Sequence, residues 1–94
     1  MSKESIKASI ERKKADIARI RTQIARERSR KSEINARYSA YIKNATAKAT
    51  KDSYRRQKAS SVAYIESSIR NYLSRIAALQ REVGSLRAML KTAK

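Results

Sequence analysis

The 94-residue sequence contains no cysteine, histidine, proline, tryptophan or phenylalanine, and it has a single glycine. Without cysteine and histidine, the chain lacks the preferred ligands of zinc and other transition metals and the nucleophile–base pairs of most covalent catalysts. One glycine supplies neither a phosphate-cradling loop nor the turns of an all-β fold. We therefore expect a protein that is not an enzyme and that carries no cofactor and no metal site.

Long apolar runs are missing as well. The longest are three or four residues, whereas a membrane-spanning helix needs about 20. The first 20 residues contain no apolar stretch of the kind found in secretory signal peptides. These absences predict a cytoplasmic chain without a transmembrane segment or a cleavable signal peptide.

What the chain does contain is a seven-residue apolar repeat in each half, with alternating steps of three and four residues. In the first half the repeat comprises Ile6, Ile10, Ile17, Ile20, Ile24, Ile34, Tyr38, Tyr41 and Ala45. In the second half it comprises Val62, Ile65, Ile69, Tyr72, Ile76, Leu79, Val83, Leu86 and Leu90. This spacing predicts two long helices, each with an apolar seam, which is interrupted in the first helix by Lys13, Glu27 and Lys31.

The repeat fades between residues 46 and 52, where Thr50 or Asp52 could cap a new helix. We predict one domain over residues 1–94: a helix over about 3–45, a loop over about 46–51 and a helix over about 52–92. The alternative is one unbroken helix, about 135 Å long, in a parallel coiled-coil dimer, since no glycine or proline forces a stop.

An antiparallel pairing matches the two seams when the paired residue numbers sum to 96. Ile10 then faces Leu86, Ile20 faces Ile76, and the centre falls on Lys48 in the weak segment, which favours a hairpin. The same pairing places Tyr38 opposite Lys58 and Tyr41 opposite Arg55, either as cation–π contacts or, the favoured alternative, as packing beside the basic stems. Spacing along each helix predicts ion pairs of Glu27 with Lys31 and of Asp52 with Arg56. The expected fold class is all-α: two long antiparallel helices forming a hairpin or coiled coil.

Two helices cover each seam residue from one side only, so we expect self-association or a helical partner to complete the fold. Apolar residues outside the seam of the second helix widen its stripe. The predicted protein interface comprises Ile17, Ile24, Tyr64, Ile69, Tyr72, Leu73, Ile76, Leu79, Val83, Leu86, Met89 and Leu90.

The 24 Lys and Arg residues exceed the 8 Asp and Glu residues, giving a net charge of +16. Such an excess repels itself in a compact state and predicts an anionic partner. The predicted contacts to that partner are Arg12, Lys13, Lys14, Arg26, Arg28, Arg30, Lys31, Arg55, Arg56 and Lys58. DNA or RNA and an acidic protein both fit, whereas a membrane surface ranks third because the basic and apolar faces are poorly separated.

The segment from Ile10 to Ile20, the polar middle of the chain and the segment from Tyr64 to Leu90 together resemble the small helical partner proteins of Gram-positive type VII secretion. The resemblance implies a helical hairpin that pairs with the helical targeting domain of an LXG toxin and is exported with it. Lys48-Ala49-Thr50 stands in the loop, where the secreted hairpins have a Trp-x-Gly turn.

Because catalysis is not expected, two interpretations of the function remain. The leading one is a helical adaptor or targeting partner that binds another helical protein, expected to be acidic, through its apolar seam. The alternative is a basic coiled-coil protein that binds nucleic acid. The sequence carries no helix-turn-helix, zinc-finger or RNA-recognition signature, so specific base reading is not expected.

Overall fold

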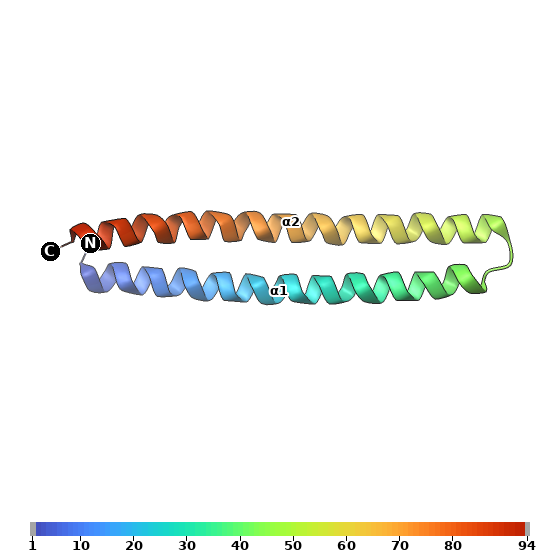
Figure 1. Cartoon of the computed structure of the whole chain (residues 1–94), viewed down its shortest axis with the longest axis horizontal. Helices are drawn as coiled ribbons and strands as arrows, with labels where there is room; N and C mark the ends of the chain where they lie inside the picture. The colour runs from blue at the N-terminus through green and yellow to red at the C-terminus, as the bar shows by residue number, and fades with distance from the viewer. Residues whose placement is uncertain (1, 94) are drawn as a thin grey trace. The chain divides into compact units, whose positions relative to one another are not determined.

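The computed structural model describes residues 2–93, which form two α-helices, α1 (Lys3–Asn44) and α2 (Lys48–Thr92) (Figure 1). These described residues contain no β-strand. The chain is therefore an all-α helical hairpin, as predicted, and the alternative of one unbroken helix is wrong.

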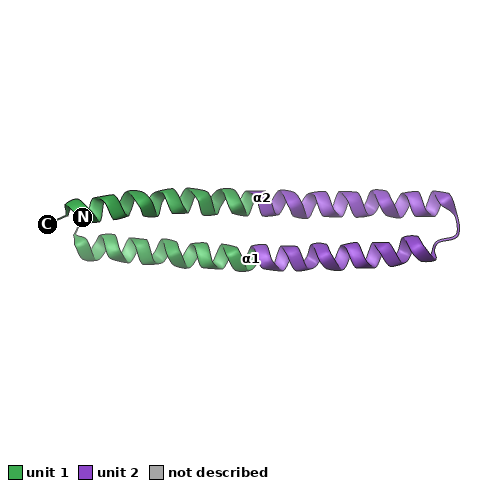
Figure 2. Ribbon diagram, in the orientation of Figure 1, with its two compact units in different colours: residues 1–23, 71–94 green, residues 24–70 purple. Residues whose placement is uncertain are grey.

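The hairpin divides into two compact units (Figure 2). Unit 1 comprises Met1–Gln23 with Asn71–Lys94, and unit 2 comprises Ile24–Arg70. Each unit contains one segment of α1 and one antiparallel segment of α2, and unit 2 also contains the loop between the helices.

The start of α1 is capped by Ser2. The backbone N–H of Ser5 donates to Ser2 Oγ at 3.1 Å, and the N–H of Ile6 donates to the carbonyl of Ser2 at 3.0 Å. A serine at this position satisfies one of the backbone donors that the first turn of a helix leaves unpaired. Ser2 therefore sets the first residue of α1.

The loop is shorter, and begins earlier, than the sequence predicted. Only residues 45–47 separate the two helices, so the predicted loop at 46–51 and the predicted helix start at 52 are wrong. The N–H of Lys51 donates to the carbonyl of Ala47 at 3.1 Å, so Thr50 and Asp52 lie inside α2 and do not cap it. The fading apolar repeat marks the end of the seam and not the end of the helix, because Ala and Lys favour helix without an apolar partner.

The core of unit 1 is aliphatic. Its buried side chains are Ile6, Ile10, Ile17 and Ile20 from α1, and Ile76 and Val83 from α2. Ile6, Ile10 and Val83 form one cluster, against which Leu86, Leu90 and Ala93 of α2 pack as partly buried residues. Burial of each such side chain contributes about 1.5–3 kcal/mol, so this seam stabilises the antiparallel pair.

The core of unit 2 is thinner. Only Ile24 and Ile65 are buried, whereas Ile34, Ile42 and Val62 are half-buried. Toward the loop the aliphatic seam gives way to Tyr38, Tyr41 and Tyr54, whose rings lie against one another. Because fewer apolar side chains are removed from water, unit 2 has less hydrophobic stabilisation than unit 1.

Candidate functional site

Most of the acidic residues are already paired with cations. Six of the 8 acids form ion pairs of 2.9 to 3.6 Å, and all eight lie in the described residues. The pairs are Lys13–Glu82, Lys14–Glu11, Arg19–Asp16, Arg30–Glu27, Lys31–Glu66 and Arg55–Asp52. Every partner is at least partly exposed, so water screens each pair and its contribution to stability is small.

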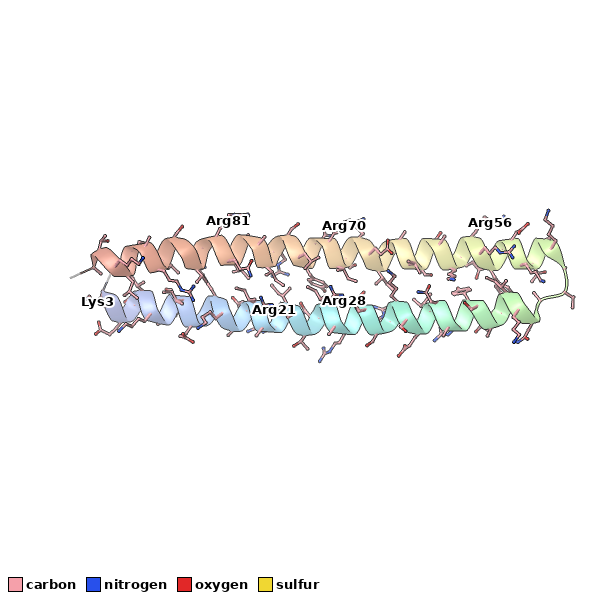
Figure 3. The ribbon with its side chains drawn as sticks, viewed as in Figure 1. Lys3, Arg21, Arg28, Arg56, Arg70 and Arg81 are labelled. Carbon is pink, nitrogen blue, oxygen red and sulfur yellow. The ribbon has the colours of Figure 1, made fainter. Side chains whose placement is uncertain are left out.

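The basic residues far outnumber these pairs. Of the 23 Lys and Arg residues between positions 2 and 93, 17 pair with no Asp or Glu of that stretch. Arg56 and Arg70 in unit 2, and Arg81 in unit 1, project from the side of α2 that points away from α1 (Figure 3). The hairpin therefore presents unneutralised positive charge on both units.

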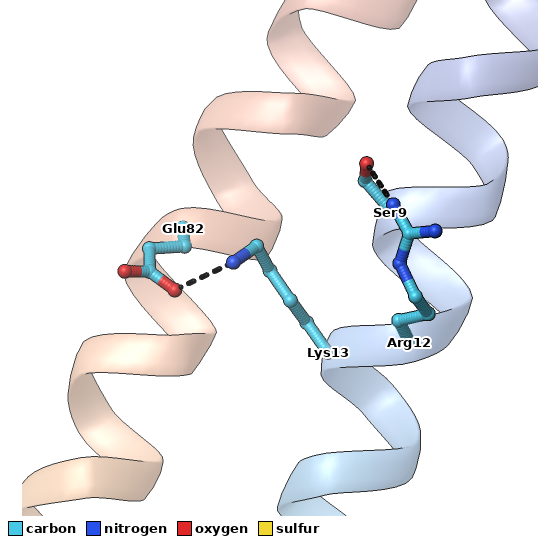
Figure 4. Close-up of polar contacts among 4 residues, drawn as sticks. All are labelled: Ser9, Arg12, Lys13 and Glu82. Atoms are coloured by element: carbon cyan, nitrogen blue, oxygen red, sulfur yellow. Dashed lines mark hydrogen bonds and ion pairs between the residues drawn. The ribbon is translucent and has the colours of Figure 1, made fainter.

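Lys13 and Glu82 join the two helices of unit 1. Lys13 Nζ donates to Glu82 Oε2 at 3.0 Å, and nearby Arg12 turns back along α1 to donate to Ser9 Oγ at 3.1 Å (Figure 4). Lys13 is a polar interruption of the first seam, and its long side chain reaches the edge of α2 while its stem stays half-buried. The residue numbers of this pair sum to 95, next to the predicted value of 96.

Lys31 and Glu66 join the two helices of unit 2 in the same way, with Lys31 Nζ 2.9 Å from Glu66 Oε1. The hydrogen bond from Lys31, reinforced by the charge of Lys31, holds the pKa of Glu66 below the ordinary value of a glutamate. The predicted pair of Glu27 with Lys31 is wrong, because Glu27 instead accepts from Arg30 at 3.1 Å. Along α1, Glu27 can reach either Arg30, three residues on, or Lys31, four residues on. Lys31 pairs across the hairpin with Glu66, so Glu27 pairs with Arg30.

The loop end of unit 2 is strongly basic. We call residues 37–58 the loop-end segment; it contains seven Lys and Arg residues and a single acid, Asp52. Arg55 donates to Asp52 at 3.0 Å, so the predicted pair of Asp52 with Arg56 is wrong. The first turn of α2 has no acid and carries Lys48 and Lys51, although the amino end of a helix is itself positive. This arrangement concentrates positive potential.

Three tyrosines form a cluster within the same segment. The rings of Tyr38 and Tyr41 meet edge to face, with centroids 5.6 Å apart, and Tyr54 lies 5.3 Å from Tyr41 and 6.3 Å from Tyr38. The hydroxyl of Tyr38 donates to Gln57 Oε1 at 3.4 Å, and Gln57 Nε2 donates to Ser53 Oγ at 3.2 Å. Tyr38 and Tyr54 are half-buried, whereas Tyr41 is 44% exposed.

The sequence did not predict this cluster. It placed Tyr38 opposite Lys58 and Tyr41 opposite Arg55, but the observed neighbours of these tyrosines include Gln57 and Tyr54, one residue earlier on α2. Tyr41 therefore meets an aromatic ring where the pairing had placed a cation. The concentration of tyrosines on both sides of the loop was the available signal.

The structure divides the ten predicted contacts to an anionic partner into two halves. Five of them form ion pairs: Lys13, Lys14, Arg30, Lys31 and Arg55. Five pair with none of the acids in residues 2–93: Arg12, Arg26, Arg28, Arg56 and Lys58. The second group is available to an external anion without breaking an existing pair.

The predicted protein interface is divided by burial. Ile17, Ile24, Ile76 and Val83 are buried within the hairpin. Ile69, Tyr72, Leu79, Leu86 and Leu90 are half-buried. Tyr64, Leu73 and Met89 are 71%, 47% and 44% exposed. Much of the proposed contact surface is therefore used by the hairpin itself.

The exposed apolar residues of unit 1 do not form a single stripe. Leu73 and Met89 are separated by 16 positions on α2, which corresponds to a rotation of about 160° at 3.6 residues per turn. They therefore lie on opposite flanks of the seam. Leu73 and Met89 thus widen the apolar stripe of α2 on both of its sides.

A hollow of about 450 Å³ in unit 1 has a mixed lining of polar and apolar side chains: Asp16, Arg19, Ile20, Gln23, Arg75, Ala78, Leu79 and Glu82. No buried side-chain polar atom in residues 2–93 lacks a hydrogen-bond partner, so no orphaned group marks a ligand position there. Over the same residues, no cluster of three or more potential metal ligands occurs. Neither described helix contains a stretch long and apolar enough to cross a membrane.

Comparisons with protein-family models, with curated proteins and with solved structures find no match to this chain.

Proposed function

We propose that this chain is a non-catalytic, basic helical hairpin that binds the phosphate backbone of nucleic acid. The observation that carries the proposal is the set of 17 cations between residues 2 and 93 that pair with no acid there. On this proposal the chain acts in the cytoplasm, where nucleic acid is present, which agrees with the compartment that the sequence predicts.

The physical basis is the release of counterions. Each phosphate neutralised by Lys or Arg frees condensed cations, which makes the affinity fall with salt, with a slope of about 0.9 per contact on logarithmic axes. The same contacts relieve the self-repulsion of a chain with a net charge of +16. A bound polyanion should therefore also stabilise the folded hairpin.

The expected mode of binding does not depend on base sequence. Unpaired cations occur on both units, on the outer side of α2 and along α1, and are not gathered on one groove-reading face. Contacts of this kind position a protein on the backbone, whereas recognition of sequence needs side chains directed at base edges.

The test is a salt titration of binding to duplex DNA and to RNA. Arg26→Gln with Arg28→Gln removes two exposed, unpaired cations of unit 2, so the slope should fall by about 1.8. Arg26→Lys with Arg28→Lys keeps the charge and is the matched control, with a slope close to that of the unchanged chain. Absence of binding to both nucleic acids at about 150 mM salt would refute the proposal.

A second candidate function is a helical adaptor for an acidic partner. It is favoured by an asymmetry in unit 1: the isoleucines of α1 are buried, whereas Leu79, Leu86 and Leu90 of α2 remain half-buried. Partly open leucines along one helix are suited to packing against a further helix, from a second copy or another protein. The resemblance to type VII secretion partners agrees with this candidate and would add export together with an LXG toxin.

Light scattering after nuclease treatment tests this candidate. Self-association predicts a mass above that of the 10.7 kDa monomer, and Leu86→Asp should return the chain to a monomer by placing charge among the open leucines. Arg87→Asp, at the neighbouring exposed position, changes charge without removing an apolar contact and should leave the mass unchanged. A monomer at every concentration, with helix content intact, excludes the self-associating form.

A further inference from the structure

We propose that the loop-end segment of unit 2 is a site for single-stranded nucleic acid, in which unpaired bases stack on Tyr41 while neighbouring cations hold the phosphates. This inference rests on the proposed function and adds the strand class that the hairpin binds. Three features of residues 37–58 support it: the excess of positive charge, the exposure of Tyr41 and the contacts among the three tyrosine rings.

The charge of the segment is nearly unopposed. It contains seven cations and one acid, and the acid is already paired with Arg55. The other six cations pair with no Asp or Glu: Arg37, Lys43, Lys48, Lys51, Arg56 and Lys58. Fewer than a quarter of the residues thus carry more than a third of the net charge, which draws a phosphate backbone to this end of unit 2.

The same segment carries exposed aromatic surface. Three of the 5 tyrosines of the chain, Tyr38, Tyr41 and Tyr54, are in the segment and contact one another. Tyr41 has the most exposed ring of the three. Basic grooves interleaved with aromatic rings are the common solution for binding single strands, since every base offers a face for stacking.

The cluster holds its rings in place. Tyr54 lies 5.3 Å from Tyr41 at an angle of 38°, and Tyr38 meets Tyr41 at 83°. Tyr38 is itself held by its hydrogen bond to Gln57. A ring that is supported by its neighbours loses little conformational entropy when a base stacks on it, so the exposed part of Tyr41 is preorganised for a ligand.

A duplex cannot use this surface in the same way. Its bases are paired and stacked inside the helix, so an aromatic ring gains contacts only where bases are unpaired. The cations act on single and double strands alike, whereas the tyrosines act on single strands alone. The strand preference therefore reports on the tyrosines and not on the charge.

The experiment measures the affinity of the full chain for fluorescent oligo-dT, for oligo-U and for a duplex of equal length. Tyr41→Leu keeps an apolar side chain but removes the ring, and should weaken binding to the single strands about tenfold while duplex binding stays unchanged. Tyr41→Phe keeps the ring and should restore the affinity. Comparison of oligo-dT with oligo-U shows whether the ribose hydroxyl contributes.

Tyr64→Leu is the matched control. Tyr64 belongs to the same unit and is more exposed, at 71%, but it lies outside the loop-end segment and beside Arg30 and Ser60. If stacking depends on the supported cluster, Tyr64→Leu should bind single strands as tightly as the unchanged chain. If any exposed tyrosine serves, Tyr64→Leu should weaken binding as much as Tyr41→Leu, and the assignment to the loop end is refuted.

Photo-crosslinking of the unchanged chain to an oligonucleotide containing 4-thiouridine gives an answer that does not depend on a folded variant. The crosslinks should fall in the peptides of residues 38–54. Equal affinity for duplex and single strands, together with crosslinks elsewhere, would overturn this inference and leave the proposed function standing. Absence of binding to every nucleic acid would overturn both.

Discussion

Lys31 Nζ of α1 lies 2.9 Å from Glu66 Oε1 of α2, so a lysine that interrupts the apolar seam of unit 2 joins the two helices by an ion pair. The Lys31 and Glu66 side chains are 37% and 44% exposed, which allows water to screen the attraction between them. The pair therefore contributes more to the choice of register than to the free energy of folding. A shift of register would separate these two groups.

The effect of Lys31 on the pKa of Glu66 can be tested directly. Lys31→Met removes the hydrogen bond and the positive charge, so the pKa of Glu66 should rise toward its ordinary value, whereas Lys31→Arg should keep it low. Because the folded pKa lies below the unfolded one, this pair stabilises the protein above the unfolded carboxyl pKa of about 4.3, and the contribution is lost as pH falls through the folded value. Carboxyl NMR titration measures both. An unchanged pKa in Lys31→Met would contradict the assigned cause.

Ile65 should be the most sensitive core position of unit 2. Its side chain is 1% exposed, so Ile65→Ala should lower the free energy of unfolding by about 2–3 kcal/mol through lost burial and a cavity. Ile69→Ala, at a half-buried position one turn away, is the comparison and should cost less. Urea unfolding followed by circular dichroism gives both values. Equal losses would show that unit 2 has no distinct core residue.

Gly84 should be a site of stabilisation. It lies inside α2, and a Cβ built at this position meets nothing within 4 Å. Gly84→Ala should therefore raise the free energy of unfolding by about 0.5–1 kcal/mol, because alanine restricts the unfolded chain and has a higher helix propensity. The thermal melt of the purified chain measures the gain, with Ser85→Ala as a neighbouring exposed control. A loss of stability in Gly84→Ala would indicate that another chain packs against this face.

Ser2 should hold the first turn of α1. Ser2→Ala removes the acceptor of the Ser5 N–H and should cost about 1 kcal/mol of local helix stability, whereas Ser2→Asp supplies another acceptor and should retain it. Amide hydrogen exchange of Ser5 and Ile6 reports on this turn. Faster exchange in the alanine variant alone is the expected pattern, and equal exchange in both variants would exclude the cap.

Added salt should stabilise the hairpin. With a net charge of +16 and only six ion pairs in the described residues, repulsion among cations outweighs the attraction within exposed pairs. Screening should therefore raise the melting temperature between low salt and about 0.5 M, since the Debye length falls below 10 Å in this range. A melting temperature that falls with sodium chloride would mean that the six pairs dominate.

Several features of this protein are determined by its sequence alone. The seven-residue repeat predicted the two helices and most of the buried seam, including Ile10, Ile20 and Ile76. It also predicted a pairing near 96, and the observed cross-helix pairs Lys13–Glu82 and Lys31–Glu66 sum to 95 and 97. Helix periodicity is a local property, so it can be read from one chain without knowledge of what lies opposite.

Only the tertiary structure decided which side chains meet across the hairpin. Tyr41 lies beside Tyr54, although the sequence pairing placed it opposite Arg55, and Lys31 reaches Glu66 in place of Glu27. Successive residues on a helix point about 100° apart, so a side chain can meet the residue before or after the one that the pairing places opposite it. The three-residue loop sets α1 and α2 antiparallel within unit 2, and the directions of the side chains then bring the three tyrosines into contact in a segment rich in cations.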